Sequence, residues 1–87
     1  MKEVLKFYSN GCNPCKQYAP TFEKVKQELS ETINFFEVNV DEDTQSLTTE
    51  YKVKGIPCTV IVVNGLEVAK QSGSLTEEQL KQFILIN

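Results

Sequence analysis

The stretch SNGCNPCK, residues 9–16, places Cys12 and Cys15 three positions apart, directly after a short apolar segment. Residues 2–8 before it combine aliphatic and aromatic side chains in a pattern typical of a β-strand. Apolar side chains then recur at helical spacing over residues 13–30. We therefore expect the two cysteines at a turn between a strand and a helix.

The predicted helix has one apolar face, formed by Ala19, Phe22, Val25 and Leu29. Its first turn carries Pro14, which is tolerated there because the first backbone N–H groups of a helix have no partner inside it. This face is expected to pack against the sheet to which the preceding strand belongs.

Two further elements follow this helix. Alternating apolar and polar residues predict a strand over Ile33–Val40. The next segment, Glu42–Tyr51, is predicted as a short helix capped by Asp41 or Asp43. The turn residues Gly55-Ile56-Pro57 then interrupt the chain.

The C-terminal third predicts a hairpin and a last helix. Cys58–Val63 is a continuous apolar run, as expected of a strand that is buried on both faces. Asn64-Gly65 is a strong signal for a two-residue hairpin turn. Its partner strand, Leu66–Gln71, is more polar and is expected at an edge of the sheet. Thr76 and Gln79 have the spacing of a capping box at the start of the last helix.

The order of elements is therefore β-α-β-α-β-β-α, in a single α/β domain over residues 1–87. The β-α-β unit predicts two parallel strands joined by a right-handed crossover. The hairpin adds two antiparallel strands. We expect a four-stranded mixed sheet flanked by three helices.

Charge and hydropathy exclude several classes of function. The net charge is −3, and the chain has no arginine, no histidine and no basic cluster, which argues against nucleic-acid binding. The longest apolar run, around residues 59–63, is far too short for a membrane span. No signal-peptide pattern precedes the first strand. We therefore expect a cytoplasmic, monomeric protein that contacts neither nucleic acid nor membrane.

Three chemical roles are open to the cysteine pair. A structural zinc site needs four nitrogen or sulfur ligands, and the chain offers three cysteines and no histidine, so we expect no metal. A structural disulfide across so short a loop removes little entropy from the unfolded chain. The unpaired N–H groups and the dipole of a helix N-terminus, by contrast, favour a thiolate at Cys12. Thiol–disulfide exchange, with Cys15 as the resolving thiol, fits this placement best.

Several motifs together resemble the thioredoxin family, and the resemblance covers nearly the whole chain. The segment Cys12-Asn13-Pro14-Cys15-Lys16 is similar to the family's Cys-Gly-Pro-Cys-Lys, with asparagine in place of glycine. The segment Gly55-Ile56-Pro57 resembles the loop whose cis proline faces the dithiol. Further matches are Phe7-Tyr8, Ala19-Pro20, Val38-Asn39-Val40-Asp41, Asn64-Gly65 and Gly73. One departure is Gly11, where the family usually has tryptophan.

This resemblance implies a thioredoxin-like fold and a thiol–disulfide oxidoreductase that reduces protein disulfides. It implies no bound cofactor beyond the redox-active Cys12–Cys15 disulfide, and as partners a thioredoxin reductase and disulfide-containing proteins. A glutaredoxin-like, glutathione-dependent enzyme and a non-catalytic adaptor with the same fold are the alternatives. Substrate contacts are expected from Gly11, Asn13, Pro14, Ile56 and Gly73.

The resemblance also assigns catalytic positions outside the cysteine motif. Pro57 is expected beside the dithiol. Six residues before the first cysteine, thioredoxins usually carry a buried aspartate that helps to deprotonate the resolving cysteine, and this chain has Lys6 there. Where the family commonly has a lysine, the chain has Glu37. We expect a partly buried Lys6–Glu37 pair beneath Cys15; the alternative is that Lys6 extends its ammonium to water along an apolar stem.

Cys58, directly after Pro57, has two interpretations. A free cysteine at the start of a buried strand behaves as a small hydrophobic residue. Alternatively, its thiol lies near the dithiol, where it forms an alternative disulfide or responds to oxidation and so modulates the redox centre.

The aromatic side chains complete the expected core. Phe7, Tyr8, Phe22 and Phe36 are predicted to be core residues. Tyr18, on the first helix, is predicted to be partly exposed.

Overall fold

A computed structural model describes all residues, 1–87, and contains the predicted elements in the predicted order. Their bounds are β1 Lys2–Tyr8, α1 Asn13–Leu29, β2 Asn34–Asn39, α2 Leu47–Glu50, β3 Cys58–Val63, β4 Leu66–Ser72 and α3 Glu77–Ile86, with a short 3₁₀ turn, Val40–Glu42, after β2.

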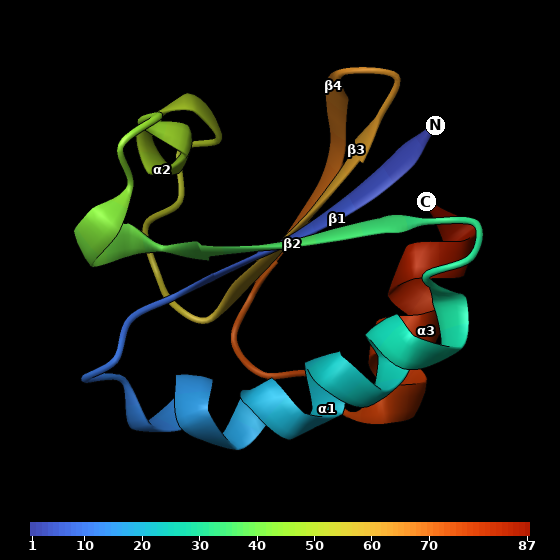
Figure 1. Ribbon diagram of the computed structural model, residues 1–87, viewed down its shortest axis with the longest axis horizontal. Helices are drawn as coiled ribbons and strands as arrows, with labels where there is room; N and C mark the ends of the chain where they lie inside the picture. Colours follow the sequence, from blue (N-terminus) through green and yellow to red (C-terminus); the bar gives the residue numbers. More distant parts are fainter.

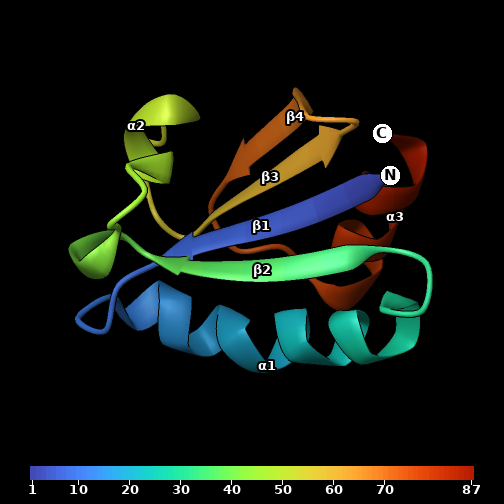
Figure 2. The ribbon, with the colours of Figure 1, turned by 45° about the horizontal axis from the view of Figure 1, so that its top comes forward.

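The four strands form one mixed sheet in the order β2-β1-β3-β4. Strand β1 pairs with β2 in parallel and with β3 antiparallel, and the β3–β4 hairpin is antiparallel. Helices α1 and α3 cover one face of this sheet, and α2 lies on the other (Figures 1 and 2). The predicted sheet and its three helices are thus confirmed.

The turn signals in the C-terminal third act as expected. Asn64 and Gly65, between β3 and β4, both have positive φ, 52° and 83°, as a tight hairpin turn requires. The Thr76 side chain accepts a hydrogen bond from the Gln79 backbone N–H, and the Gln79 side chain accepts one from the Thr76 backbone N–H. This capping box begins α3 at Glu77.

The sheet separates two clusters of buried side chains. On the α1 and α3 side the cluster consists of Val4, Tyr18, Phe22, Val25, Ile33, Ile61, Leu80 and Ile84. On the α2 side it consists of Leu5, Phe7, Val38, Cys58, Val60 and Val62. Because successive side chains of a strand point to opposite faces, β1 and β3 contribute to both clusters.

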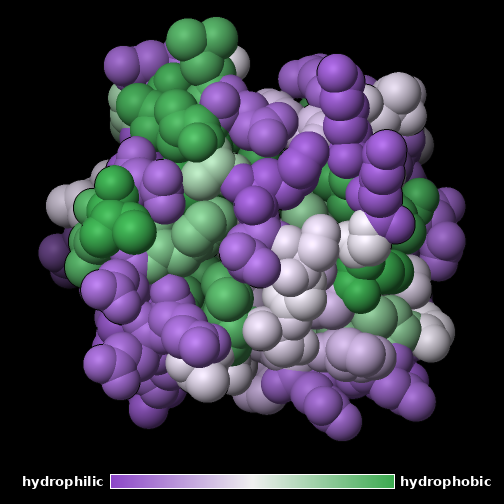
Figure 3. All heavy atoms as spheres, turned by 180° about the vertical axis from the view of Figure 1, so that it is seen from behind, coloured by the Kyte–Doolittle hydropathy of each residue, from purple (hydrophilic) through white to green (hydrophobic).

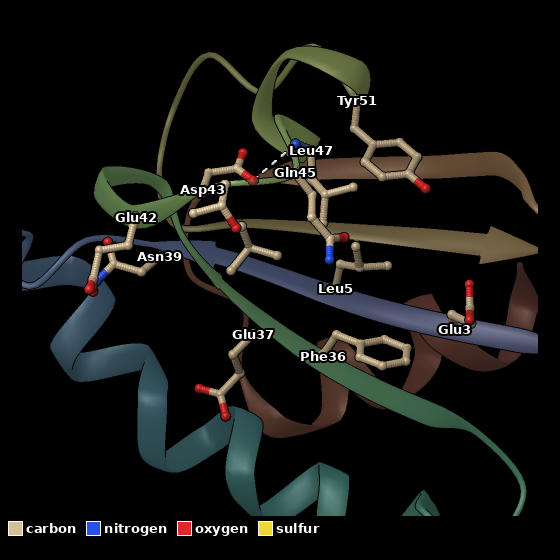
Figure 4. A pocket seen from close by; sticks show the side chains of 12 residues that line it. Glu3, Leu5, Phe36, Glu37, Asn39, Glu42, Asp43, Gln45, Leu47 and Tyr51 are labelled. Atoms are coloured by element: carbon tan, nitrogen blue, oxygen red, sulfur yellow. Dashed lines mark hydrogen bonds between the residues drawn. The ribbon is translucent and has the colours of Figure 1, made fainter.

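The segment predicted as one helix over Glu42–Tyr51 contains a shorter helix. The α-helix is confined to Leu47–Glu50, after Ser46 in a left-handed conformation with φ of 57°. The Asp43 carboxylate accepts a hydrogen bond from the backbone N–H of Leu47 at 3.0 Å (Figure 4) and another from that of Thr48 at 2.6 Å. Asp43, one of the two predicted capping residues, thus caps the start of the helix from a position outside it.

Phe36 is not a core residue, contrary to the expectation. It lies on the edge strand β2 and is 46% exposed. On this side of the sheet α2 is only one turn long, and a hollow of about 440 Å³ lined by Phe36, Leu5, Leu47 and Tyr51 is left beside it (Figure 4). The neighbouring Phe35 points to the other face and packs edge-on against Phe22, with ring centroids 5.7 Å apart.

Tyr18 was predicted to be partly exposed, and this is wrong. Its side chain is 1% exposed, and its hydroxyl is hydrogen-bonded to the Thr59 hydroxyl at 2.8 Å. The buried residues of α1 are Cys15, Tyr18, Phe22 and Val25. The predicted apolar face shared Phe22 and Val25 but had Ala19 in place of Tyr18. Tyr8, another expected core residue, is half-buried.

We expect Tyr18→Phe to lower the free energy of unfolding by about 1–3 kcal/mol, because it leaves the buried Thr59 hydroxyl without a partner. Urea denaturation measures the loss. Thr59→Val in the Tyr18→Phe background is the control, since removing both polar partners is less costly than removing one. A single variant as stable as the wild type would contradict the role of this bond.

The same hydroxyl makes stability depend on alkaline pH. Burial raises the pKa of Tyr18 to about 12, from 10.0. The unfolded tyrosine therefore ionises first, and the contribution of Tyr18 to stability is complete below pH 10 and is lost between pH 10 and about 12. We expect Tyr18→Phe to flatten this part of the pH–stability curve.

The outer surface is mixed in character. The back of the molecule is mostly hydrophilic, with apolar side chains in separate groups (Figure 3). None of the helices has both the length and the apolar composition that a membrane crossing requires.

Candidate active site

The junction between β1 and α1 brings the two cysteines together. Cys12 is the N-cap of α1, with extended backbone angles of φ −98° and ψ 108°, and Cys15 lies in the first turn. Their Cα atoms are 5.2 Å apart and their sulfur atoms form a disulfide. The Cys12 Sγ also accepts a hydrogen bond from the backbone N–H of Cys15 at 3.1 Å. The predicted strand–turn–helix setting of the pair is therefore present.

The two sulfur atoms differ in their access to solvent. Cys12 is half-buried, whereas Cys15 is 3% exposed and packs on the buried face of α1. An N-cap position favours an anion, because helix N–H groups without intrahelical partners point toward it. The geometry thus gives an accessible sulfur in a site that stabilises a thiolate, with a second sulfur directly behind it.

The loop before β3 lies against this pair. The Ile56–Pro57 peptide bond is cis, and the Ile56 carbonyl oxygen is 3.9 Å from the Cys12 Sγ. Pro57 is buried, and its carbonyl accepts a hydrogen bond from the Gly73 N–H at 2.7 Å. Gly73 has a φ of +94°, which side-chain-bearing residues rarely adopt. The turn after β4 therefore supports the proline loop from behind.

The remaining expected contact residues surround the accessible sulfur. Gly11, Asn13 and Pro14 are exposed, and no atom lies within 4 Å of a Cβ built on Gly11. The Ser74 hydroxyl donates a hydrogen bond to the Pro14 carbonyl at 3.4 Å, which joins the turn before α3 to the start of α1. The surface around Cys12 is open and is built from three separate segments of the chain.

Lys6 and Glu37 are brought together on the α1 side of the sheet. The Lys6 side chain is only 3% exposed, and its Nζ is 3.0 Å from a carboxylate oxygen of Glu37, which is 40% exposed. Lys6 and Cys15 both line a hollow of about 470 Å³. The expected partly buried pair is thus present, and the lysine is not extended freely into water.

Cys58 lies on the other face of the sheet. Its side chain is fully buried in the α2-side cluster, whereas Cys15 belongs to the helix that covers the α1 side. Burial raises the pKa of the Cys58 thiol, so the reactive thiolate is disfavoured. The structure does not bring Cys58 together with the dithiol.

We expect Cys58→Thr to change the rate of disulfide reduction less than about twofold, since its volume is similar and it lies away from the reacting sulfur atoms. After mild peroxide treatment, non-reducing peptide mapping should find only the Cys12–Cys15 bridge. A bridge that includes Cys58 would contradict this expectation and restore a modulating role.

Two hydrogen bonds that support the site were not expected from the sequence. Tyr18 and Thr59 place a buried hydrogen bond between α1 and β3, one turn from Cys15. The helical spacing of Cys15, Tyr18 and Phe22 was the available signal, because these positions share one helix face. The hydrogen bond of Ser74 had no such signal, since it depends on the tertiary fold. No group of three or more histidine, cysteine or acidic side chains is arranged to hold a metal ion.

Nearly the whole chain is similar to known proteins. The family model Thioredoxin matches residues 1–85. The chain is 35% identical over 81 residues to a thioredoxin of Haemophilus influenzae, covering 93% of this chain and 75% of that protein. It is 32% identical over 83 residues to a thioredoxin of Mycoplasmoides gallisepticum, covering 95% and 81%. The X-ray structure of Fasciola hepatica thioredoxin superimposes with a TM-score of 0.87 at 30% identity, covering 98% of this chain and 79% of that one.

Proposed function

The chain belongs to the thioredoxin family and is a thiol–disulfide oxidoreductase, and on that premise we propose that it reduces protein disulfides by two successive thiol–disulfide exchanges at Cys12 and Cys15. The observation that carries this proposal is the asymmetry of the pair. One sulfur is accessible at a helix N-terminus and the other is buried one turn behind it.

In the first exchange the Cys12 thiolate attacks one sulfur of a substrate disulfide. A Cys12–substrate disulfide forms, and the other substrate sulfur leaves as a thiolate that takes a proton from solvent. In the second exchange the Cys15 thiolate attacks the Cys12 Sγ and the second substrate sulfur leaves. Two electrons pass from the dithiol to the substrate, and the protein ends in the disulfide form described above.

The loop of Ile56 and Pro57 is proposed to hold the substrate during these steps. A substrate segment that lies against this loop in an extended conformation would have its disulfide beside Cys12, since the Ile56 carbonyl is 3.9 Å from that sulfur. Gly11, Asn13, Pro14 and Gly73 would form the rest of the contact surface. Gly11 leaves the surface open where a larger residue would form a wall, which favours bulky, folded substrates.

A cytoplasmic thioredoxin reductase is the proposed electron donor, and disulfide-bonded proteins are the proposed substrates. The competing glutathione-dependent reaction is not favoured, because the chain has no arginine and no histidine to bind the carboxylates of glutathione. The protein is proposed to act as a monomer without a bound cofactor.

Coupled assays test this proposal. Insulin reduction with dithiothreitol should be accelerated by the protein, and a failure to accelerate it would favour a non-catalytic adaptor. NADPH oxidation should be faster through thioredoxin reductase than through glutathione and its reductase. The opposite order of rates would assign the protein a glutaredoxin-like role.

A further inference from the structure

Lys6 is a charged residue in the interior of the sheet. It belongs to the central strand β1, where its register partners are Glu37 on β2 and Thr59 on β3. Its side chain is 3% exposed, and Glu37 is the one acidic group with which it forms an ion pair. A buried ammonium is costly unless it is paired, so the burial of Lys6 depends on Glu37.

Aromatic rings fix the position of the ammonium. The Lys6 Nζ is 5.0 Å from the centroid of the Phe22 ring and 5.1 Å from that of Tyr8. Both distances lie within the range of cation–π attraction. The ammonium is thus held on the α1 side of the sheet by two rings and one carboxylate.

This same side carries the resolving sulfur. Lys6, Glu37 and Cys15 line one hollow, together with residues of the β1–α1 turn. Cys15 is 3% exposed, so its surroundings have a lower effective dielectric than water, and a nearby charge acts on it more strongly than at the surface.

We propose that the Lys6 ammonium, held by Glu37, is a positioning residue that favours the thiolate of Cys15 and so accelerates the second exchange. This inference rests on the proposed function. The Cys15 thiol gives its proton to solvent, its thiolate attacks the Cys12 Sγ, and the substrate sulfur leaves with the electron pair of the broken bond.

The other titratable groups near this hollow do not replace that effect. Glu37 is opposite in charge, but it is 40% exposed and therefore better screened than Lys6. Lys16 is exposed on α1. Tyr18 stays neutral because burial raises its pKa to about 12, and the Tyr8 phenol ring is in contact with the ammonium itself.

Exchanging the two charges separates an electrostatic role from a structural one. The double variant Lys6→Glu/Glu37→Lys keeps an ion pair between β1 and β2 but puts a negative charge on the buried side. Lys6→Met removes the buried charge, and Lys6→Arg is the conservative control that retains it. The measurement is the pH titration of thiolate absorbance in a Cys12→Ser/Cys58→Thr background, where Cys15 is the only thiol.

We expect the Cys15 titration to move upward by about 1 pH unit in Lys6→Met and further in the charge exchange, and to stay near the parent value in Lys6→Arg. In the background with both redox cysteines intact, Lys6→Met should slow release of the mixed disulfide more than its formation. Lys6→Met and Glu37→Gln should be non-additive in stability. Circular dichroism shows whether each variant is folded. If Lys6→Met does not fold, the Cys15 titration of the charge-exchange variant is compared with that of the parent instead.

An unchanged titration in Lys6→Met would overturn the proposal. The proposal would also be overturned if the charge-exchange variant had the same Cys15 titration and the same stability as the parent. The ion pair would then serve only to join β1 and β2. The titration needs no substrate. Failure of the proposed function would instead appear as a wild-type protein that reduces no disulfide.

Discussion

Cys12→Ser is expected to reduce no protein disulfide and to form no covalent complex with a substrate, whereas Cys15→Ser is expected to accumulate a stable mixed disulfide. Cys12 carries the accessible sulfur at the helix N-terminus, and Cys15 carries the buried one that completes the reaction. Without Cys12 the first bond cannot form. Without Cys15 the first bond forms but is not resolved.

Non-reducing gel electrophoresis and mass spectrometry after incubation with a disulfide-bonded substrate measure this difference. Cys58→Thr is the matched control, since it removes the third cysteine and should leave turnover intact. A covalent complex trapped by Cys12→Ser through Cys15, with none in Cys15→Ser, would reverse the assigned roles.

Phe22→Ala is expected to lower the free energy of unfolding by about 3–5 kcal/mol. The Phe22 ring is fully buried between α1 and the sheet, contacts the Tyr18 and Phe35 rings, and lies 5.0 Å from the Lys6 ammonium. Its removal leaves a cavity and also weakens the surroundings of a buried charge. Small domains have only about 5–15 kcal/mol of total stability, so much of this chain would unfold at moderate temperature.

Phe36→Ala is the matched control for this loss. The same atoms are removed, but Phe36 is 46% exposed at the edge of the sheet, so we expect a change of about 1 kcal/mol or less. Urea denaturation of both variants measures the difference. Equal losses at the two positions would show that Phe36 belongs to the core after all.

The fold could be predicted from the sequence because its signals are local. The strand–turn–helix pattern around Cys12, the Asn64-Gly65 turn and the capping box at Thr76 each depend on residues close together in the chain. They determined the number, type and order of the elements. The parallel pairing of β1 with β2 followed from the β-α-β order alone.

The errors concern side chains whose environment is set by distant residues. The exposure of Phe36 depends on its edge position and on the shortness of α2, neither of which local alternation in β2 reveals. Burial of Tyr18 depends on the Thr59 hydroxyl across the core, 41 positions along the chain.

In the candidate site, the sequence located the cysteines, and the resemblance to a family indicated the proline loop. The Lys6–Glu37 pair was predicted from the same resemblance, because the chain has a lysine where the family usually has a buried aspartate and a glutamate where the family commonly has a lysine. The two rings that hold the ammonium, and the hollow shared with Cys15, could not be predicted because they arise from packing of α1 on the sheet.

The central claim is that Cys12 is the nucleophile and Cys15 the resolving thiol, and alkylation of the reduced protein tests it most directly. A brief pulse of iodoacetamide at neutral pH, followed by peptide mass spectrometry, identifies which cysteine reacts first. Cys12 should be labelled well before Cys15, since it is more accessible and lies at the helix N-terminus, and Cys58 should stay unlabelled while the protein is folded. Labelling of Cys15 before Cys12 would contradict the account.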